Sequence, residues 1–264
     1  MARELSVVVP TRNEAASIDP FLAALSPALE GMDAEVIFVD DSSDDTPAVV
    51  ERHAAVSSIP VHLRHRPAGE RADGLGGAVK LGFEAAEGGL IAVMDVDLQH
   101  PPGLLRPMVE AMRSDADLVI GSRFTGGAGV GDFGLVRRAV SRGSSTLARA
   151  LFPTRLRQVT DPMSGYFLVR REVLAVGELR PHGFKILLEV LVRSGPLRVA
   201  EVPYTFGERV AGTSKASLRE GWNHLVHLLR LRLGLGGAKP GALVPRDERE
   251  RVGDIGIGVA RVVE

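Results

Sequence analysis

The stretch 90–102 constrains this chain most, because an apolar run stops there abruptly at two aspartates. The five apolar residues 90–94 are typical of a strand buried on both faces. Asp95 and Asp97 follow two positions apart, so both carboxylates are expected on one face if the strand continues that far. Mg²⁺ is typically held by one or two carboxylates with substrate phosphates, and open α/β sheets bind ligands at this end of their strands. The pair alone is equally compatible with a polar turn.

Strand-like and helix-like segments alternate along the rest of the chain. Short β-branched or apolar runs predict strands at residues 5–9, 36–39, 61–63, 90–94 and 118–120. Helical spacing, a proline at a helix start and a glycine-rich turn predict helices at residues 14–29, from 46 onward, from 74 to about 86, 102–113 and from about 137 onward. This alternation predicts an α/β fold with a mostly parallel central sheet flanked by helices.

The composition is that of a globular protein. The 264 residues are 45% apolar and 25% charged, enough for one α/β domain with a full core or for two small domains. A net charge of −1 gives no electrostatic reason to expect nucleic-acid binding. The absence of cysteine excludes disulfides, thiolate metal sites and a cysteine nucleophile. No apolar run approaches the roughly 18 residues of a membrane span, and the run before Pro10 is too short for the core of a signal peptide.

An acidic run and a glycine-rich turn follow the second and third expected strands. Asp40 and Asp41 end the second strand, where a carboxylate can accept hydrogen bonds from a nucleobase edge or from ribose hydroxyls. Asp44 and Asp45 belong to the first turn of the next helix, and we interpret them as structural because carboxylates there interact favourably with the helix dipole. The glycine-rich turn 73–77 lacks the third glycine of a dinucleotide fingerprint, so we expect it to let a helix pack closely on the sheet.

Arginines without acidic neighbours follow the last expected strand. Arg123 comes directly after it, and Arg137 and Ser141 lie four residues apart in the next helix, so the latter two share one helix face. An arginine and a hydroxyl on one face can bind one phosphate, whereas a solvated helix face is the common alternative. The spacing alone does not decide between them.

Several motifs in register resemble the family 2 glycosyltransferases, which have a GT-A fold. The matching segments are residues 7–14 (VVVPTRNE), 39–42 (VDDS), 94–102 (MDVDLQHPP) and 121–124 (GSRF). Further segments resemble the subgroup of polyprenol-phosphate mannosyltransferases, the dolichol-phosphate mannose synthases, at residues 161–167 (DPMSGYF), 183–189 (GFKILLE) and 209–215 (RVAGTSK). The likeness extends from residue 4 to about 233. Arg12 departs from the aromatic residue usual at that position, and Val96 departs from a small residue.

The resemblance implies a role for each matching residue. Guanosine contacts would come from Pro10, Arg12, Glu14, Val39 and Asp41. The diphosphate and a divalent metal ion, Mg²⁺ or Mn²⁺, would be held by Asp95, Asp97 and Gln99, with Val96 also lining the nucleotide-sugar site. The phosphates would be contacted by Arg123, Arg209 and Lys215, and the catalytic residues would be Asp97, Arg123 and Lys215. The acceptor phosphate would be held by Arg137 and Ser141, and the sugar or acceptor region would include Lys185 and Glu189.

The activity that the resemblance implies is inverting transfer of mannose from GDP-mannose to a polyprenyl monophosphate. The nucleophile would be a phosphate monoester with a second pKa of about 6, already anionic at neutral pH, so no general base is needed. We interpret Asp161, which lies where a base could be sought, as orienting arginine or serine groups. Two alternatives stay open: a UDP-glucose-dependent transferase for the same lipid, and an inactive nucleotide-sugar-binding module, which we would expect to lack Asp97 or Lys215.

A helix with a hydrophobic stripe is expected at about residues 215–235. The stripe consists of Leu218, Trp222, Leu225, Val226, Leu229 and Leu233. Such a helix either lies in a membrane interface or packs on its own domain. We therefore expect a catalytic domain over residues 1–235 and a linker with a flexible tail over 236–264. The enzyme would be peripheral on the cytoplasmic face of the membrane, with an integral-membrane protein as a further candidate partner.

Overall fold

The structure is a computed structural model, and it describes residues 3–126, 135–181, 183, 185–207, 228–229 and 231–233. For residues 135–141 it describes the helical backbone without the side chains. The expected tail at residues 236–264 and most of the expected helix at 215–235 lie outside the described residues.

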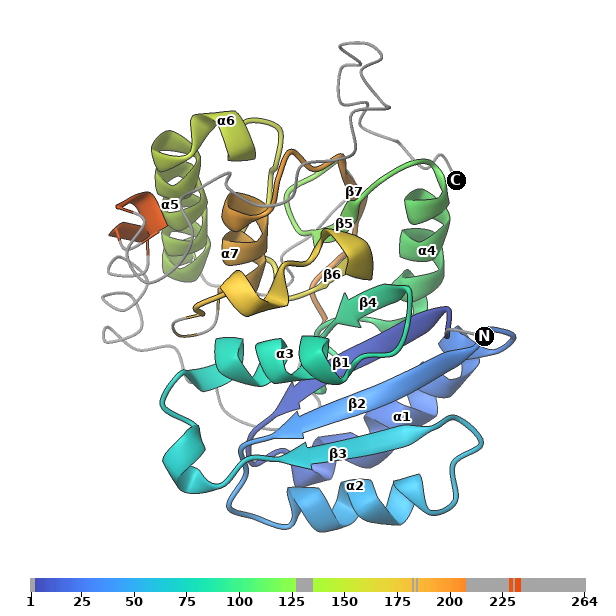
Figure 1. Ribbon diagram of the computed structural model, residues 1–264. Helices are drawn as coiled ribbons and strands as arrows, with labels where there is room; N and C mark the ends of the chain where they lie inside the picture. Colours follow the sequence, from blue (N-terminus) through green and yellow to red (C-terminus); the bar gives the residue numbers. More distant parts are fainter. Residues whose placement is uncertain are drawn as a thin grey trace.

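In the described part of the chain, seven strands form one mixed sheet (Figure 1). The order across the sheet is β3-β2-β1-β4-β6-β5-β7, and β6 is antiparallel to both of its neighbours while the other pairs are parallel. The strands are β1 (Leu5–Thr11), β2 (Ala34–Asp40), β3 (Val61–His65), β4 (Leu90–Val93), β5 (Leu118–Ser122), β6 (Phe167–Arg170) and β7 (Val199–Pro203). The expected α/β fold with a mostly parallel sheet is confirmed.

Helices cover both faces of the sheet (Figure 1). They are α1 (Ala15–Leu29), α2 (Thr46–Ala54), α3 (Gly74–Ala85), α4 (Leu105–Arg113), α5 (Leu135–Leu151), α6 (Pro153–Leu156) and α7 (Ile186–Arg193). Val7 and Val9 of β1 belong to a core shared with α1, α2 and α4, whereas Val8 belongs to a second core shared with α3, α6 and α7. The alternation of strand side chains thus separates the two cores.

β1 runs two residues further than predicted, through Pro10 to Thr11. Met94 N donates to Val8 O, so the even-numbered residues of β1 direct their backbone groups toward β4. Pro10 has no N–H to donate on this side and β4 ends at Val93, so from this point β1 pairs only with β2. The proline therefore lies inside β1 at the position where the pairing with β4 stops.

The sequence pattern does not predict β6 and β7. β6 has four residues and ends in an arginine, which is too short for a clear periodicity. β7 carries Glu201 at its centre and Pro203 at its end, and both residues are unusual in a strand. In the structure Glu201 is buried, and hydrogen bonds that it accepts from a neighbouring loop compensate for the loss of water.

The glycine-rich turn contacts another loop rather than the sheet. Gly74 begins α3 with φ +67°, a conformation that favours glycine. A Cβ on Gly76 would lie 2.9 Å from Gly183 O, the same oxygen that accepts the Gly76 N–H at 2.7 Å. The close approach to the sheet comes later in α3, at Gly82, where a Cβ would lie 2.3 Å from Val8 Cγ1. Helix-to-sheet packing thus depends on Gly82, and the turn fixes the loop around Gly183.

Candidate active site

The carboxyl ends of the parallel strands β1, β2 and β4 meet at one edge of the sheet (Figure 1). Pro10 lies opposite Val39 in register, and Asp41 N donates to Thr11 O at 2.9 Å. Pro10, Val39 and Asp41, all predicted to contact a nucleoside, are therefore neighbours. Since the Val39 side chain is fully buried in the core, this residue can offer a ligand its backbone groups.

The loops after β1 and β2 are joined by hydrogen bonds. Asn13 has φ +55°, which asparagine tolerates, and its N–H donates to Ser42 Oγ at 2.7 Å. Glu14 N donates to Thr46 Oγ1 at 3.0 Å, and Glu14 Oε2 accepts the Arg12 N–H at 3.2 Å. The predicted nucleoside residues Arg12 and Glu14 thus lie in a loop whose shape is fixed by the neighbouring strand connection.

Asp40 and Asp41, adjacent in the sequence, have different surroundings. Asp40 is fully buried and accepts hydrogen bonds from Thr11 Oγ1 at 2.8 Å and His65 Nδ1 at 2.7 Å. These contacts give Asp40 a structural role between three strands. Asp41 forms a two-point ion pair with Arg66, with Nε 2.7 Å from Oδ1 and Nη2 2.6 Å from Oδ2. Sequence reasoning does not find Arg66, because nothing in the local pattern indicates a contact 25 residues away.

Asp95 and Asp97 lie in a turn and not on a strand. β4 ends at Val93, so the condition for a shared strand face is not met. The chain turns at Leu98, which has φ +62°, and Asp97 Oδ1 accepts the Gln99 N–H at 3.1 Å. The Asp95 side chain is 43% exposed, whereas Asp97 is 3% exposed. Asp95 is therefore open to a ligand, and Asp97 also stabilises the turn.

His100 supports this turn from the protein interior. Its Nδ1 accepts the Asp95 N–H at 3.0 Å, and its ring stacks on Tyr166 with centroids 5.2 Å apart. Tyr204 and Phe206 approach the ring edge-on, with centroids at 6.0 and 5.8 Å. Burial lowers the pKa of His100 to about 4, so the imidazole is neutral at physiological pH and forms no ion pair with the Asp95 carboxylate 3.6 Å away. The sequence indicates His100 solely by its place in the motif 94–102.

Arg123, which follows β5, is fixed by a two-point ion pair with Asp161. Arg123 Nε lies 2.7 Å from Oδ2 and Nη2 lies 2.9 Å from Oδ1, and the carboxylate is fully buried. Burial alone would lower the pKa of Arg123, but the hydrogen bonds to Asp161 and its charge outweigh burial and raise this pKa. Glu201 in turn accepts N–H groups of Thr160 at 2.8 Å and Asp161 at 3.2 Å. Asp161 thus orients an arginine, as expected.

The donor set at this edge suits a hard divalent cation bound jointly by the protein and a diphosphate. Within the described residues, no three acidic or histidine side chains come together as a preformed metal site. Asp95 and Asp97 supply carboxylate oxygens, which suit Mg²⁺ and Mn²⁺ and typically bind them together with substrate phosphates. The Nδ1 lone pair of His100 is already used by the Asp95 N–H. The residues present therefore fit a metal ion that takes its other ligands from substrate and water.

Several predicted site residues cannot be placed around this edge. Arg209 and Lys215 lie outside the described residues. Arg137 and Ser141 belong to α5, which confirms that they are on one helix, but their side chains are not described.

Lys185 and Glu189, at the start of α7, form contacts within the protein. Glu189 is fully buried, and its Oε1 accepts hydrogen bonds from Arg193 Nε at 2.7 Å and from the backbone N–H of Arg180 at 2.5 Å. Burial raises the pKa of Glu189, although these hydrogen bonds act in the opposite direction. Lys185 Nζ donates to Met163 O at 3.3 Å, in the loop that carries Asp161. Glu189 Oε1 is thus bound within the protein, whereas its buried Oε2 has no hydrogen-bond partner among the described residues.

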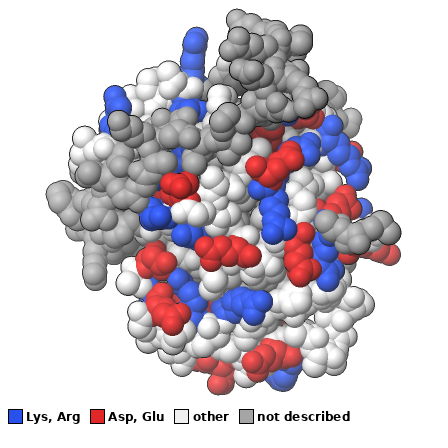
Figure 2. All heavy atoms as spheres, viewed as in Figure 1, with Lys and Arg blue, Asp and Glu red and all other residues white. Residues whose placement is uncertain are grey.

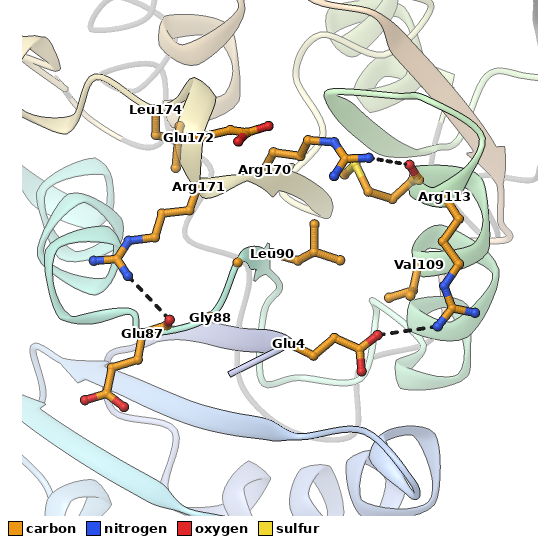
Figure 3. A pocket seen from close by; sticks show the side chains of 12 residues that line it. Glu4, Glu87, Gly88, Leu90, Val109, Arg113, Arg170, Arg171, Glu172 and Leu174 are labelled. Carbon is orange, nitrogen blue, oxygen red and sulfur yellow. Dashed lines mark hydrogen bonds and ion pairs between the residues drawn. The ribbon is translucent and has the colours of Figure 1, made fainter. Parts of the chain in front are cut away.

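A cavity of about 780 Å³ lies at the opposite edge of the sheet, where β1 and β4 begin (Figure 3). Its arginines connect neighbouring elements: Arg170 donates to Met112 O at 2.9 Å, and Arg171 donates to Glu87 O at 3.4 Å. No predicted site residue lines this cavity. On the face drawn in Figure 2, positive and negative side chains are interspersed over the described residues, as the net charge of −1 implies.

Comparisons with known proteins agree with the geometry. The family model described as glycosyl transferase family 2 matches residues 6–177. A dolichol-phosphate mannosyltransferase of Pyrococcus furiosus is 38% identical over 229 residues, which cover 86% of this chain and 63% of that protein. A dolichol-phosphate mannosyltransferase of Mycosarcoma maydis is 36% identical over 246 residues, which cover 87% of this chain and 80% of that protein. The chain thus spans less than two thirds of the length of the Pyrococcus relative.

The fold is similar to that of a solved enzyme. Glucosyl-3-phosphoglycerate synthase of Mycobacterium tuberculosis, solved in complex with Mn²⁺, UDP-glucose and glycerol 3-phosphate, matches with a TM-score of 0.58 and 25% identity. The match covers 88% of this chain and 81% of that one. The GT-A fold expected from the motifs is confirmed.

Proposed function

Since the chain belongs to glycosyl transferase family 2, we propose that it transfers mannose from GDP-mannose to a polyprenyl monophosphate, with inversion at the anomeric carbon. The observation that carries this proposal is the likeness, over 86% of the chain, to a relative named a dolichol-phosphate mannosyltransferase. Dolichyl phosphate is a polyprenyl-type lipid phosphate, which defines the acceptor class.

The nucleoside would bind where β1 and β2 end. Pro10 and Val39 are opposite each other there, with Asp41 one step beyond β2. Arg12 is exposed in the loop after β1, and its guanidinium would stack on a base where relatives have an aromatic ring. Glu14, half-buried in the same loop, would accept a hydrogen bond from a ribose hydroxyl.

The diphosphate and the metal ion would bind at the turn after β4. Asp95, Asp97 and Gln99 would hold Mg²⁺ or Mn²⁺, and support comes from the solved neighbour, whose complex contains Mn²⁺ and UDP-glucose. Val96 has a fully buried side chain, so it would contribute its backbone to the nucleotide-sugar site. A divalent ion bound here would neutralise charge on the diphosphate.

The departure of GDP would be assisted by fixed cations. As the bond between the anomeric carbon and the diphosphate oxygen breaks, negative charge builds on the diphosphate, and preorganised cations near that oxygen lower the barrier. Arg123 is already immobilised by Asp161, and its Nη1 group, which forms no hydrogen bond with the described residues, would donate to a phosphate. Arg209 and Lys215 would add positive charge from the segment after β7, and Asp97, Arg123 and Lys215 would be the catalytic residues.

The acceptor would be a phosphate monoester held by Arg137 and Ser141 on one face of α5. One of its oxygens attacks the anomeric carbon from the face opposite the leaving GDP, which inverts the configuration. With a second pKa of about 6, this nucleophile is anionic at neutral pH and needs no general base. The role of Asp161 as the partner of Arg123, and not as a base, is consistent with such an acceptor.

The enzyme would act at the cytoplasmic face of a membrane as a peripheral protein, where an integral-membrane partner could also hold it. Among the described residues, no helix is long and apolar enough to cross a bilayer. Leu229 and Leu233 of the predicted stripe are 46% and 68% exposed, whereas Leu228 and Leu231 are buried in the core. This exposure favours a stripe that faces a membrane interface over one packed on the domain. Residues 1–235 would form the catalytic domain and 236–264 a tail.

A second candidate donor is UDP-glucose, because the solved neighbour of the same fold was captured with it. An inactive nucleotide-sugar-binding module is a weaker alternative, since the sequence keeps both Asp97 and Lys215.

Calorimetric titration of the full chain with GDP, UDP, GDP-mannose and UDP-glucose, each with and without Mg²⁺, tests the proposed donor. We expect the guanosine ligands to bind at least about tenfold more tightly than the uridine ligands, and to lose affinity without the metal ion. Tighter binding of UDP-glucose would replace the proposal with the second candidate.

A further inference from the structure

Arg66 uses all of its hydrogen-bond donors within the protein. A guanidinium carries five N–H groups. Nε and one Nη2 N–H donate to the Asp41 carboxylate, and the second Nη2 N–H donates to Gly74 O at 2.9 Å. Nη1 donates to Asp73 Oδ1 at 2.7 Å and to Glu70 O at 3.4 Å. No donor remains for a ligand, so Arg66 acts through the residues that it holds.

The Asp41 carboxylate has a fixed orientation as a result. Its side chain is 8% exposed and that of Arg66 is 6% exposed, so little water competes for the pair. A carboxylate has about four acceptor positions, and the two-point contact with Arg66 takes two of them. Arg71 Nε lies 4.0 Å from Oδ1, beyond hydrogen-bond distance, so among the described residues one position remains on each oxygen. A donor on a bound molecule therefore meets an acceptor whose direction is set before binding.

The contacts that fix Arg66 come from three separate elements. Its backbone N–H donates to Asp40 O at 2.8 Å, at the end of β2. Asp73 and Gly74 hold the guanidinium from the start of α3. Arg71 closes the arrangement, because its Nε donates to Arg66 O at 2.7 Å and its Nη2 donates to Ser42 O at 3.0 Å. The orientation of Asp41 is thus built into the fold.

We propose that Arg66 is a positioning residue for nucleobase selection, which holds Asp41 so that its carboxylate accepts a hydrogen bond from an N–H on the guanine edge. The inference rests on the proposed function, because that function places guanine at Asp41. Guanine presents adjacent N1–H and N2–H donors on this edge, whereas adenine presents its N6–H donor beside an unprotonated N1 that a carboxylate repels. A carboxylate held in one direction favours guanine more strongly than a mobile one, because no orientational freedom is lost on binding.

A double-mutant cycle on base selectivity tests this role. The dissociation constants of GDP and ADP, with Mg²⁺, would be measured for the full chain and for Arg66→Lys, Asp41→Asn and the double variant. Lysine keeps the charge but cannot make the two-point contact. We expect Arg66→Lys to weaken GDP binding about tenfold and ADP binding by less than about twofold. The double variant should bind GDP no more weakly than Asp41→Asn alone.

Two further variants keep the test decisive. Arg64→Lys is the matched control, because Arg64 is exposed on β3 outside this cluster, and it should leave both nucleotides unchanged. If Arg66→Lys does not fold, Asp73→Asn takes its place in the cycle, because it removes one partner of the guanidinium at a side chain that is 46% exposed. We expect it to reduce the preference for GDP about threefold, and not at all when Asp41 is already asparagine.

Equal weakening of GDP and ADP, or losses that add in the double variant, would show that Arg66 merely stabilises the fold and would overturn the proposal. A wild-type preference for UDP over GDP is a different result. It would contradict the proposed donor and remove the guanine assignment of Asp41 with it. A GDP preference that survives Arg66→Lys contradicts the positioning role alone.

Discussion

Arg123 and Asp161 lie 38 residues apart in the sequence and form a two-point ion pair in the protein interior, with Nε–Oδ2 and Nη2–Oδ1 distances of 2.7 and 2.9 Å. Glu201 of β7 accepts the backbone N–H of Asp161 and so fixes this residue from a third element. Two of the motifs, at 121–124 and 161–167, thus meet in one contact. In the proposed reaction, Arg123 would therefore need no reorganisation as negative charge develops on the diphosphate.

The first prediction concerns the stability of this pair. Asp161→Asn removes a buried charge partner, and because breaking a buried ion pair costs about 3–5 kcal/mol, the free energy of unfolding should fall by about 3 kcal/mol or more. Urea denaturation measures the change. Asp115→Asn is the control, since Asp115 pairs with Arg198 at the surface and its side chain is 76% exposed, so its loss should be below about 1 kcal/mol. A variant at position 161 as stable as this control would show that the pair contributes little.

The second prediction separates metal binding from turn stability. The gain in GDP affinity on addition of Mg²⁺ should be about tenfold smaller in Asp95→Ala than in the wild type. The melting temperature should stay nearly unchanged, because the Asp95 side chain is 43% exposed. Asp97→Ala should abolish transfer and also lower the melting temperature, because Asp97 accepts the Gln99 N–H. Calorimetry and thermal unfolding measure the two effects. Full activity of the wild type in excess chelator would remove the metal ion from the mechanism.

The third prediction distinguishes donor from acceptor. Arg137→Ala should raise the KM for polyprenyl phosphate about tenfold or more, because a charged hydrogen bond is worth roughly 1.5–3 kcal/mol, and Ser141→Ala should have a smaller effect. The affinity for GDP should stay within about twofold in both. Arg113→Ala, at the opposite edge of the sheet, is the control and should change neither constant. Parallel losses of GDP affinity would place these residues at the donor site.

The fourth prediction uses two adjacent leucines. Leu229 is 46% exposed and Leu228 is fully buried, so Leu229→Glu should weaken binding to anionic vesicles without unfolding the protein, whereas Leu228→Glu should destabilise the fold. Trp222→Glu combined with Leu229→Glu should reduce vesicle sedimentation further. Binding should also weaken as salt is added, because each cation near an anionic leaflet contributes on the order of 1 kcal/mol. Undiminished sedimentation of the folded double variant would place the membrane contact elsewhere.

The sequence predicts the part of this fold that has a strong local signal. β1, β2, β4 and β5 are apolar runs, and the motifs after them correctly indicate the carboxyl edge of a parallel sheet as the place where polar residues gather. The sequence pattern does not predict β7, because Glu201 interrupts the apolar run. The buried Glu201 carboxylate is compensated by hydrogen bonds from Thr160 and Asp161, which are distant in the sequence.

The parts of the site that the sequence does not predict are long-range contacts. Arg66 finds Asp41 through the pairing of β2 with β3, and His100 supports Asp95 through a stack with Tyr166 of a distant loop. The spacing of Asp95 and Asp97 predicts a shared strand face, and this prediction is wrong because β4 ends before them. The local periodicity of a sequence does not indicate at which residue the hydrogen-bonded pairing of a strand ends.

Transfer itself is the most direct test. The full chain would be incubated with Mg²⁺, vesicles containing a polyprenyl monophosphate, and equal concentrations of radiolabelled GDP-mannose or UDP-glucose, with Asp97→Ala as the blank. The account predicts a lipid-linked mannose formed from GDP-mannose, with the anomeric configuration opposite to that of the donor, and little product from UDP-glucose. Lipid-linked glucose as the main product, or no product from a folded protein that binds GDP-mannose, would contradict it.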